Sequence, residues 1–398
     1  MDPHTAVGYK VMREYQKSDD QHLNILLSTA SPYKFIQAVS KALGLSGGSS
    51  DQESIQNIHA KTGFPIPTNI ENLWKQTSQR PSHIAVKDMK KICRKQRKGA
   101  MEMIKITVPA TSANFGPGFD CLGVAVNLYN TFYFSDNNQG KLSIEGCPVE
   151  FQNENNLVYR AFKIGCDYLG KPVPNVQIKI ENGIPISRGL GSSASCIVAG
   201  IQAADWFQSE ISKDKLLALS MNLEPHPDNL APAIYGKLCS THQIEQGDSK
   251  VIQHAISEKF KFTVIIPDYQ VSTAKARQIL PDSLRYSDIT LQLSRVILLM
   301  QSLSSGNLVD LDEGLKDLLH EPYRSKLIPD YKDVKNLISR YGSSMYISGS
   351  GSTMISITDN DINRDKIINE LSSIYPDWHI KPISINNTGV KSEVVENK

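Results

Sequence analysis

The segment PISRGLGSSAS, residues 185–195, decides how this chain is interpreted. Its glycines, Gly189 and Gly191, permit backbone conformations that a Cβ atom would forbid. An apolar run, ASCIVAGIQAADWF, follows from Ala194. The segment therefore predicts a tight turn that opens onto the amino terminus of a helix. Free N–H groups and the helix dipole attract anions at such a terminus, so we expect it to bind a phosphate chain.

Two well-known phosphate signatures do not describe this segment. It has no lysine at the position that a GxxxxGK[ST] loop requires, and its spacing after Gly191 does not fit GxGxxG. A purely structural alternative is a serine N-cap on the helix, with glycines that allow close packing. The segment alone does not separate this alternative from a phosphate site.

Three further polar segments stand where turns are expected. They are PATSANFGPGFDCLG (109–123), NLEPHPDNLAP (222–232) and YISGSGSTMISI (346–357). The first and third, taken alone, are typical of an ordinary turn or hairpin. The prolines of the second would stiffen a loop that presents polar side chains to a ligand. Together with 185–195 they supply a phosphate cradle, a carboxylate for a metal and polar groups for a small substrate, which indicates a phosphotransferase.

The composition is that of an ordinary globular protein. The 398 residues suggest two or three domains, and 40% are hydrophobic while 21% are charged. A net charge of +2 offers no field toward nucleic acid or membrane. Neither a signal peptide nor an apolar run of about 18 residues is present. The six cysteines form no CxxC pair or zinc spacing, so reduced thiols and a cytoplasmic location are expected.

The hydrophobic pattern changes at Met101. Before it we expect helices at 5–18 and 34–43, a strand at 24–30 and a loop at 43–54. The basic stretch 87–98 is interpreted as a solvated linker, with nucleic-acid binding as the alternative. After Met101 the pattern predicts strands at 104–108, 177–182 and 262–268, and helices at 193–207 and 289–303. Interleaved strands and helices of this kind favour an α+β fold in two layers.

The four polar segments, PATSANFGPGFD, PISRGLGSSAS, EPHPDN and GSGST, resemble in this order the GHMP small-molecule kinases. NLVYRA (156–161), VSTAKARQILP (271–281) and HEPYRSKLIPDY (320–331) are similar to the homoserine kinases of that family. The resemblance covers 103–398. It implies a ribosomal-protein-S5-like ATP-binding domain at 101–260 and a ferredoxin-like α/β sandwich at 261–398.

The resemblance also implies a reaction. The γ-phosphoryl group of ATP would pass to the hydroxyl of L-homoserine, giving O-phospho-L-homoserine and ADP in threonine biosynthesis. A homodimer is left open. The alternative within the fold is another GHMP kinase, for mevalonate-type or sugar substrates. A non-catalytic nucleotide-binding module that uses the basic linker is a further alternative.

Site residues carried over from the resemblance fall into three groups. ATP would be bound by Pro185, Ile186, Ser187, Arg188, Gly189, Leu190, Gly191, Ser192, Ser193, Ala194 and Ser195, with Asn156 and Val158 near the adenosine. Mg²⁺ would be held by Ser193 and Glu224, both counted as catalytic with Asp228 and Asn229. Asp228 would act as base and Asn229 would orient the hydroxyl. The homoserine site would contain Asn114, Asp120, His226 and Asn229, with Asp120 on the ammonium group and Arg277 and Arg324 on the carboxylate.

The first hundred residues resemble a different enzyme. DPHTAVGYKVMREY, ILLSTASPYKF and TGFPIPTNIENL are similar to the carboxy-terminal end of bacterial threonine synthase, a pyridoxal-phosphate enzyme, over roughly 1–80. That enzyme's Schiff-base lysine lies upstream of this part, and Thr29 would at most lie beside the pyridine ring. We therefore expect residues 1–100 to be a remnant and a linker, with poorly buried helices and no pyridoxal-phosphate activity. A junction of neighbouring reading frames and a genuine fusion are both compatible with this pattern, and a working threonine synthase fragment is the alternative.

Overall fold

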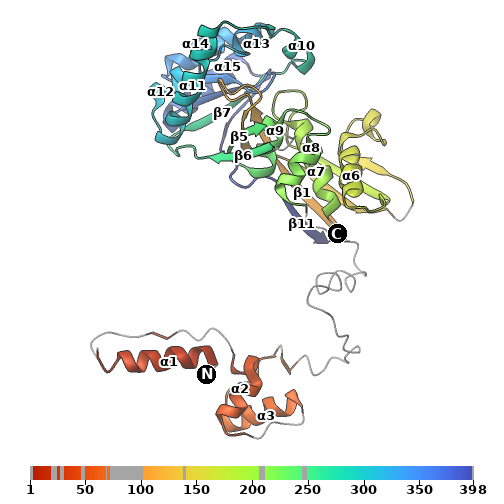
Figure 1. The fold of residues 1–398 in the computed structure, drawn as a ribbon, viewed down its shortest axis with the longest axis vertical. Coiled ribbons are helices and arrows are strands. Elements are labelled where there is room, and N and C mark those ends of the chain that lie inside the picture. The colour runs from red at the N-terminus through yellow and green to blue at the C-terminus, as the bar shows by residue number, and fades with distance from the viewer. Residues whose placement is uncertain are drawn as a thin grey trace. The chain divides into compact units, whose positions relative to one another are not determined.

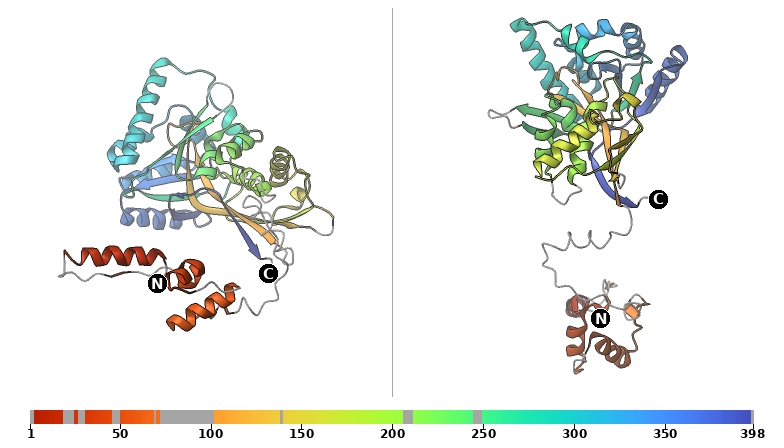
Figure 2. Two further views of the ribbon diagram at one scale, coloured as in Figure 1. Left: turned by 60° about the horizontal axis from the view of Figure 1, so that its bottom comes forward. Right: turned by 90° about the vertical axis from the view of Figure 1, so that its right-hand side faces the viewer.

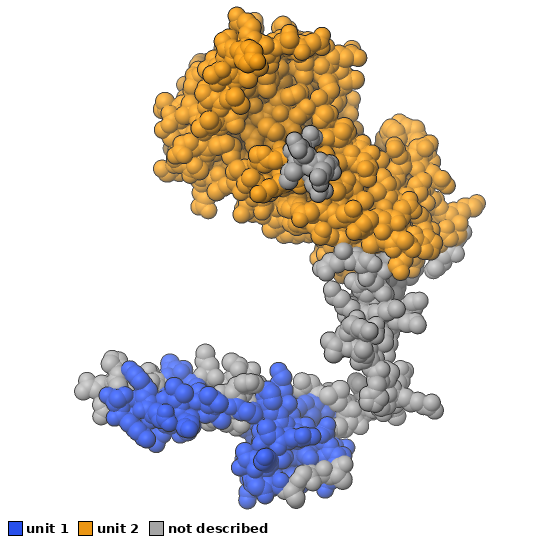
Figure 3. Space-filling view, in the orientation of Figure 1, with its two compact units in different colours: residues 1–89 blue, residues 90–398 orange. Residues whose placement is uncertain are grey.

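The computed structural model describes residues 3–18, 25–26, 31–45, 50–68, 70–71, 102–137, 140–205, 211–243 and 249–396. These residues belong to two compact units, 1–89 and 90–398 (Figure 3). In the described ranges, no helix combines the length and the hydropathy that crossing a membrane requires.

Unit 1 is helical where it is described. Its elements are α1 (Pro3–Tyr15), a 3₁₀ turn (Pro32–Phe35), α2 (Ile36–Ala42) and α3 (Asp51–Thr62). A small core is formed by Tyr33, Val39, Ile55 and Ile58. The two helices expected at 5–18 and 34–43 are confirmed, whereas α3 was not predicted. Ser50 caps α3 by accepting a hydrogen bond from the N–H of Glu53 at 3.2 Å, so the loop expected at 43–54 ends too late.

The apolar face of α1 remains exposed within unit 1. Val7 and Val11 are 66% and 61% exposed, and Tyr15 is half exposed. These residues are the ones whose spacing predicted the helix, and the expectation of a poorly buried helix is confirmed for α1. The strand expected at 24–30 lies outside the described residues except for Ile25 and Leu26, and so do Thr29 and the basic stretch 87–98.

The first sheet of unit 2 has seven strands among the described residues. Its main path runs β11-β1-β2-β4-β3, and β5 pairs with both β2 and β6. The bounds are β1 Glu102–Ala113, β2 Leu122–Asp136, β3 Ser143–Glu145, β4 Val176–Asn182, β5 Leu238–Gln243, β6 Ser249–His254 and β11 Lys391–Glu396. In β1, Ile104, Ile106 and Val108 are buried and alternate with more exposed residues, as the strand predicted at 104–108 requires.

Helices cover this sheet and contribute its core. They are α6 (Leu157–Tyr168), α7 (Ser192–Ala204), α8 (Lys213–Ser220) and α9 (Pro227–Tyr235), and Figure 1 shows them gathered around β1. The core joins Ile106 and Phe132 of the sheet to Phe162 of α6 and Ile197 of α7. Figure 2 shows that the carboxy-terminal strand β11 returns to lie beside β1, with which it pairs in antiparallel register.

The second sheet of unit 2 has four antiparallel strands in the order β10-β7-β9-β8. They are β7 Lys261–Ile266, β8 Ser344–Ile347, β9 Met354–Thr358 and β10 His379–Ile383. The accompanying helices are α10 (Thr273–Gln278), α11 (Tyr286–Ser305), α12 (Leu308–Leu315), α13 (Glu321–Arg324), α14 (Tyr331–Arg340) and α15 (Asp361–Ile374). The α+β class and the strands and helices predicted in this unit are confirmed.

Candidate active site

The glycine-rich turn opens onto α7, which begins at Ser192. Its N-cap is Gly191, in the left-handed conformation with φ 68°, and no side chain caps the helix. The alternative of a serine N-cap is therefore wrong. Since the amide groups of the first turn have no side-chain cap, they are available to a ligand in the adjoining cavity.

Close packing explains the two glycines of the turn. A Cβ atom on Gly191 would lie 1.9 Å from Thr111 Oγ1, and one on Gly189 would lie 2.2 Å from the carbonyl oxygen of Ser348. Both residues also have positive φ, 68° and 76°. Only glycine combines this backbone with so little space.

The turn at 348–353, which follows β8, supports the cradle from the second sheet. The Ser348 hydroxyl donates to the carbonyl oxygen of Gly189 at 2.6 Å and lies 2.8 Å from the hydroxyl of Ser112. The N–H of Gly349 donates to the carbonyl oxygen of Ala113 at 3.0 Å. The GSGST segment thus joins the end of β1 to the cradle, which places the site where the two sheets meet.

A cavity of about 360 Å³ lies at this junction. It brings together most of the residues that the sequence predicted for the site, namely Asn114, Asp120, Ile186, Ser187, Arg188, Gly189, Leu190, Gly191, Ser192, Ser193, Ala194, Glu224, His226, Asp228, Asn229, Arg277 and Arg324. Thr273, Gly349 and Ser350 complete the lining. Six segments distant in sequence therefore converge on one space.

Four of the expected ATP-site residues do not line this cavity: Pro185, Ser195, Asn156 and Val158. The buried hydroxyl of Ser195 donates to the Ser192 carbonyl oxygen at 2.7 Å. Asn156 is the N-cap of α6 and accepts from the N–H of Val158, whose side chain belongs to the core. These contacts are structural, and a role of these residues toward adenosine remains a prediction.

Three carboxylates, Asp120, Glu224 and Asp228, share the cavity. Asp228 lies in the first turn of α9 and is 3% exposed. Its burial, and then the nearby Asp120 and Glu224, raise the pKa of Asp228 to about 7. Burial also raises the pKa of Glu224, and Arg277 opposes this effect. Both carboxyl groups therefore lie where an additional positive charge would stabilise their ionised forms.

Asp120 is paired with Arg277 in this structure. The two nitrogens Nη2 and Nη1 of Arg277 donate to Oδ1 and Oδ2 of Asp120 at 2.9 and 3.1 Å. His226 Nδ1 lies 3.6 Å from Asp120 Oδ2. Asn114 fixes this loop, because its Oδ1 accepts from the N–H of Asp120 at 2.9 Å.

Arg324 is held differently from Arg277. It is 3% exposed, and it donates to the carbonyl oxygens of Ala276 and Gly349 at 3.2 and 2.8 Å. Burial and then the neighbouring Arg277 lower the pKa of Arg324 to about 10. Its positive charge is retained at neutral pH.

Sequence reasoning missed three residues of the site. Phe119 lies under both guanidinium groups, with Cζ of Arg277 and of Arg324 at 5.5 and 5.1 Å from its ring centroid. Thr111 donates its hydroxyl to Asn229 Oδ1 at 2.8 Å, and Thr273 lines the cavity. Phe119 and Thr111 both lie in the quoted segment 109–123, but only the fold shows which of its side chains face the site.

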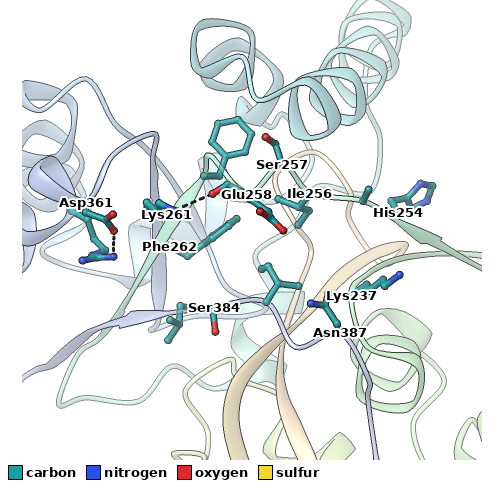
Figure 4. Close-up of a pocket in the computed structure, with 15 residues that line it drawn as sticks. Lys237, His254, Ile256, Ser257, Glu258, Lys261, Phe262, Asp361, Ser384 and Asn387 are labelled. Atoms are coloured by element: carbon teal, nitrogen blue, oxygen red, sulfur yellow. Dashed lines mark hydrogen bonds and ion pairs between the residues drawn. The ribbon is translucent and has the colours of Figure 1, made fainter. Parts of the chain in front are cut away.

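A second cavity, of about 500 Å³, lies elsewhere in unit 2 and is shown in Figure 4. Its basic residues are dispersed, with Lys261 and Lys237 on opposite sides of the hollow. Lys261 donates to the carbonyl oxygen of Glu258 at 3.0 Å, and Arg364 pairs with Asp361. The lining contains no glycine, and it reaches the first turn of α15 at Asp361 and Arg364. That helix terminus is capped by Asn360, which accepts from the N–H of Asn363 at 2.8 Å, and it carries the carboxylate of Asp361, so it offers no phosphate cradle.

Metal binding by protein groups alone is not indicated in the part of the chain that the structure describes. No group of three or more His, Cys, Asp or Glu side chains there could hold an ion. Any cation at Ser193 and Glu224 would need further ligands from phosphate or water, which is the usual arrangement for Mg²⁺.

Family models match three parts of the chain. "GHMP kinases N terminal domain" matches residues 156–237, and "GHMP kinases C terminal" matches residues 299–377. "Threonine synthase, C-terminal" matches residues 5–93. The resemblances drawn from the sequence are confirmed for both units.

Relatives and solved structures agree with these matches. Homoserine kinase of Clostridium botulinum (Type A) is 40% identical over 292 residues, which is 72% of this chain and 97% of the relative. The crystal structure of homoserine kinase from Cytophaga hutchinsonii has a TM-score of 0.65 and 27% identity, covering 73% of this chain and 97% of that one. L. major mevalonate kinase shares the fold, with a TM-score of 0.56, 16% identity and coverage of 71% and 96%. The chain therefore belongs to the homoserine kinases of the GHMP kinase family.

Proposed function

We propose that the chain transfers the γ-phosphoryl group of ATP to the side-chain hydroxyl of L-homoserine in the cavity between its two sheets. The observation that carries this proposal is the convergence of an uncapped helix terminus, buried carboxylates and two arginines on one space. Such transfers depend on alignment and charge neutralisation more than on strong base catalysis. The cavity supplies groups for both tasks.

The donor would lie with its phosphates in the cradle 186–194. The amide groups at the start of α7 would bind phosphate oxygens, aided by the helix dipole. Gly189 and Gly191 let the backbone approach the ligand closely, because no side chain intervenes. The proposed contacts of Asn156 and Val158 with adenosine would extend the nucleotide site beyond this cavity.

The charge balance of the cavity supports a role for Mg²⁺. Its lining contains three carboxylates, on Asp120, Glu224 and Asp228, and three guanidinium groups, on Arg188, Arg277 and Arg324, so 3 − 3 leaves no net charge. Counted as formal charges, the side chains of the lining therefore leave the charge of a triphosphate unbalanced, and the amide groups of α7 offset only part of it. The exposed Ser193 and the desolvated Glu224 fit the ion as ligands, and Mg²⁺ would neutralise developing phosphate charge.

The acceptor would be oriented through both of its charged groups. Asp120 would bind the ammonium group, while Arg277 and the rigidly held Arg324 would bind the carboxylate. Asn114 would line the same subsite, where it fixes Asp120, and so would His226. A mevalonate-type or sugar substrate carries no ammonium group, so Asp120 favours an amino-acid acceptor over those alternatives.

Two residues would act on the hydroxyl. Asp228, with a pKa near 7, is suited to accept a proton at neutral pH. Asn229 has its amide oxygen occupied by Thr111, which leaves its NH₂ group to orient the acceptor oxygen. We place the enzyme in the cytoplasm because the described cysteines are free, and we leave a homodimer as a further proposal.

The proposal is tested by incubating the full chain with ATP, Mg²⁺ and L-homoserine, and by following ADP release and O-phosphohomoserine formation. Mevalonate and galactose serve as comparison acceptors. We expect turnover with homoserine that exceeds turnover with either comparison by orders of magnitude. The proposal would be refuted if the folded protein, incubated with ATP, Mg²⁺ and homoserine, released no ADP and formed no O-phosphohomoserine.

A further inference from the structure

The ion pair between Asp120 and Arg277 occupies the proposed acceptor site. Asp120 follows the turn after β1 of the first sheet, and Arg277 lies in the last turn of α10 beside the second sheet. The ion pair therefore connects, across the cavity, the part of unit 2 built on the first sheet with the part built on the second. The two hydrogen bonds, at 2.9 and 3.1 Å, form the parallel fork that guanidinium and carboxylate prefer. The side chain of Arg277 is 42% exposed and that of Asp120 is 28% exposed, so a ligand can reach the pair.

The two arginines of the site are unequal. Arg324 is buried and anchored on the carbonyl oxygens of Ala276 and Gly349, whereas Arg277 is half exposed and anchored on a carboxylate. Both guanidinium groups face the ring of Phe119, whose π face attracts them and offsets their mutual repulsion. Only Arg277 must therefore exchange its partner when a carboxylate ligand arrives.

We infer that the Asp120–Arg277 pair is a latch that makes the acceptor site selective for zwitterions. An α-amino acid carries both charges that the pair offers. Its ammonium group replaces Arg277 at Asp120, and its carboxylate replaces Asp120 at Arg277. An alcohol with only one charged group opens the latch but leaves Asp120 or Arg277 without a partner. This inference rests on the proposed function, because it takes the same residues as the homoserine site.

If the ion pair is a latch, replacing one of its members should raise kcat/KM for a substrate analogue that carries only one charge. Residues that merely contact the substrate would not give such an increase. In Arg277→Gln, Asp120 has lost its arginine partner and keeps only His226 Nδ1 at 3.6 Å, so 3-aminopropan-1-ol, which lacks only the carboxylate, is phosphorylated better than by the wild type. In Asp120→Asn, Arg277 is free, so 4-hydroxybutanoate, which lacks only the ammonium group, is the improved acceptor. Since the pair is partly exposed and screened by solvent, we expect each gain in kcat/KM to be about fivefold. Homoserine turnover falls in both variants.

The experiment measures kcat/KM of the full chain for homoserine and both analogues, at low and high ionic strength. Arg285→Gln is the matched control, because it breaks the Arg285–Asp288 pair on the surface and leaves all three values unchanged. If each variant leaves its analogue unchanged or makes it a poorer acceptor, the latch is refuted. Wild-type turnover of homoserine is the separate test of the proposed function, and thermal denaturation with ATP shows that the variants are folded.

Discussion

Gly191→Ala is the substitution that most directly tests the phosphate cradle. The added methyl group would lie 1.9 Å from Thr111 Oγ1 and 3.2 Å from Asn229 Oδ1. The alanine would also have to adopt a φ of 68°, a conformation that is unfavourable for any residue with a Cβ atom. Thr111 has little freedom to withdraw, because its hydroxyl is bonded to Asn229.

The expected cost has two parts. A left-handed backbone costs an L-residue about 1–2 kcal/mol, and overpacking of a closely packed site costs about 1–3 kcal/mol. Gly342 separates the two parts, since it has φ 61° but nothing within 4 Å of an added Cβ atom. We therefore expect Gly342→Ala to lower stability by the first amount alone, and Gly191→Ala to lower it by about 2–5 kcal/mol.

The assay combines thermal denaturation with nucleotide kinetics. A loss of 1 kcal/mol lowers Tm by about 2–4 °C in a domain of 150–250 residues, so the two variants are distinguishable. Gly191→Ala should also raise the KM for ATP at least tenfold, whereas Gly342→Ala should leave it unchanged. Equal losses of stability in both variants, or a destabilised Gly191→Ala with normal ATP affinity, would refute the assignment of the cradle.

Four further changes to the chain test the site and the independence of the kinase unit. Asp228→Asn should lower kcat by about 10²-fold or more if Asp228 is the base. Because the pKa of Asp228 is raised, its protonated form stabilises the folded wild type. This stabilisation is fully present below pH 3.8 and is lost as the pH rises through about 7. The difference in Tm between Asp228→Asn and the wild type should therefore shift in favour of the variant from pH 5 to pH 8. Glu224→Gln should weaken the apparent Mg²⁺ affinity about tenfold in a magnesium titration, while the Tm without Mg²⁺ does not fall, because burial disfavours the ionised form of Glu224. Arg324→Lys keeps the charge but loses the planar fork, so the KM for homoserine should rise about tenfold while that for ATP stays constant. Removal of residues 1–100 should leave kcat with homoserine unchanged, because 90–398 is compact by itself.

Local patterns were sufficient to predict the elements that have a clear hydrophobic period, but not all elements of the fold. The alternation in 104–108 and the apolar run after Gly191 predicted β1 and α7. These predictions succeeded because the side chains that a strand or helix buries recur at a fixed spacing in the sequence. The helix α3 was missed although its capping signal, Ser50 with Glu53, is local too. That signal was overlooked beside the glycines at 47–48, which suggested a longer loop.

The contacts between side chains across the site could not be predicted from the sequence. Ser348 and Gly189 are 159 residues apart, and Asp120 and Arg277 are 157 apart, so no local pattern could join them. The resemblance identified Asp120 and Arg277 as residues for substrate groups of opposite charge. It did not indicate that they bind each other, because that contact depends on how α10 lies against the turn after β1.

The two sheets divide the work of the site between them. The cradle, Asp120, the loop with Glu224 and the first turn of α9 with Asp228 belong to the half built on the first sheet. Arg277 and Arg324 come from α10 and α13 beside the second sheet. Under the proposed function, phosphate binding would rely on backbone amides and on two glycines, Gly189 and Gly191, that cannot change without a clash. Recognition of the acceptor's carboxylate would rely, under the same proposal, on two side chains that lie on short helices of six and four residues. A change of acceptor would therefore require new side chains on α10, on α13 and at Asp120, while the phosphate cradle stays intact, which gives a physical reason why kinases of different acceptors can share this fold.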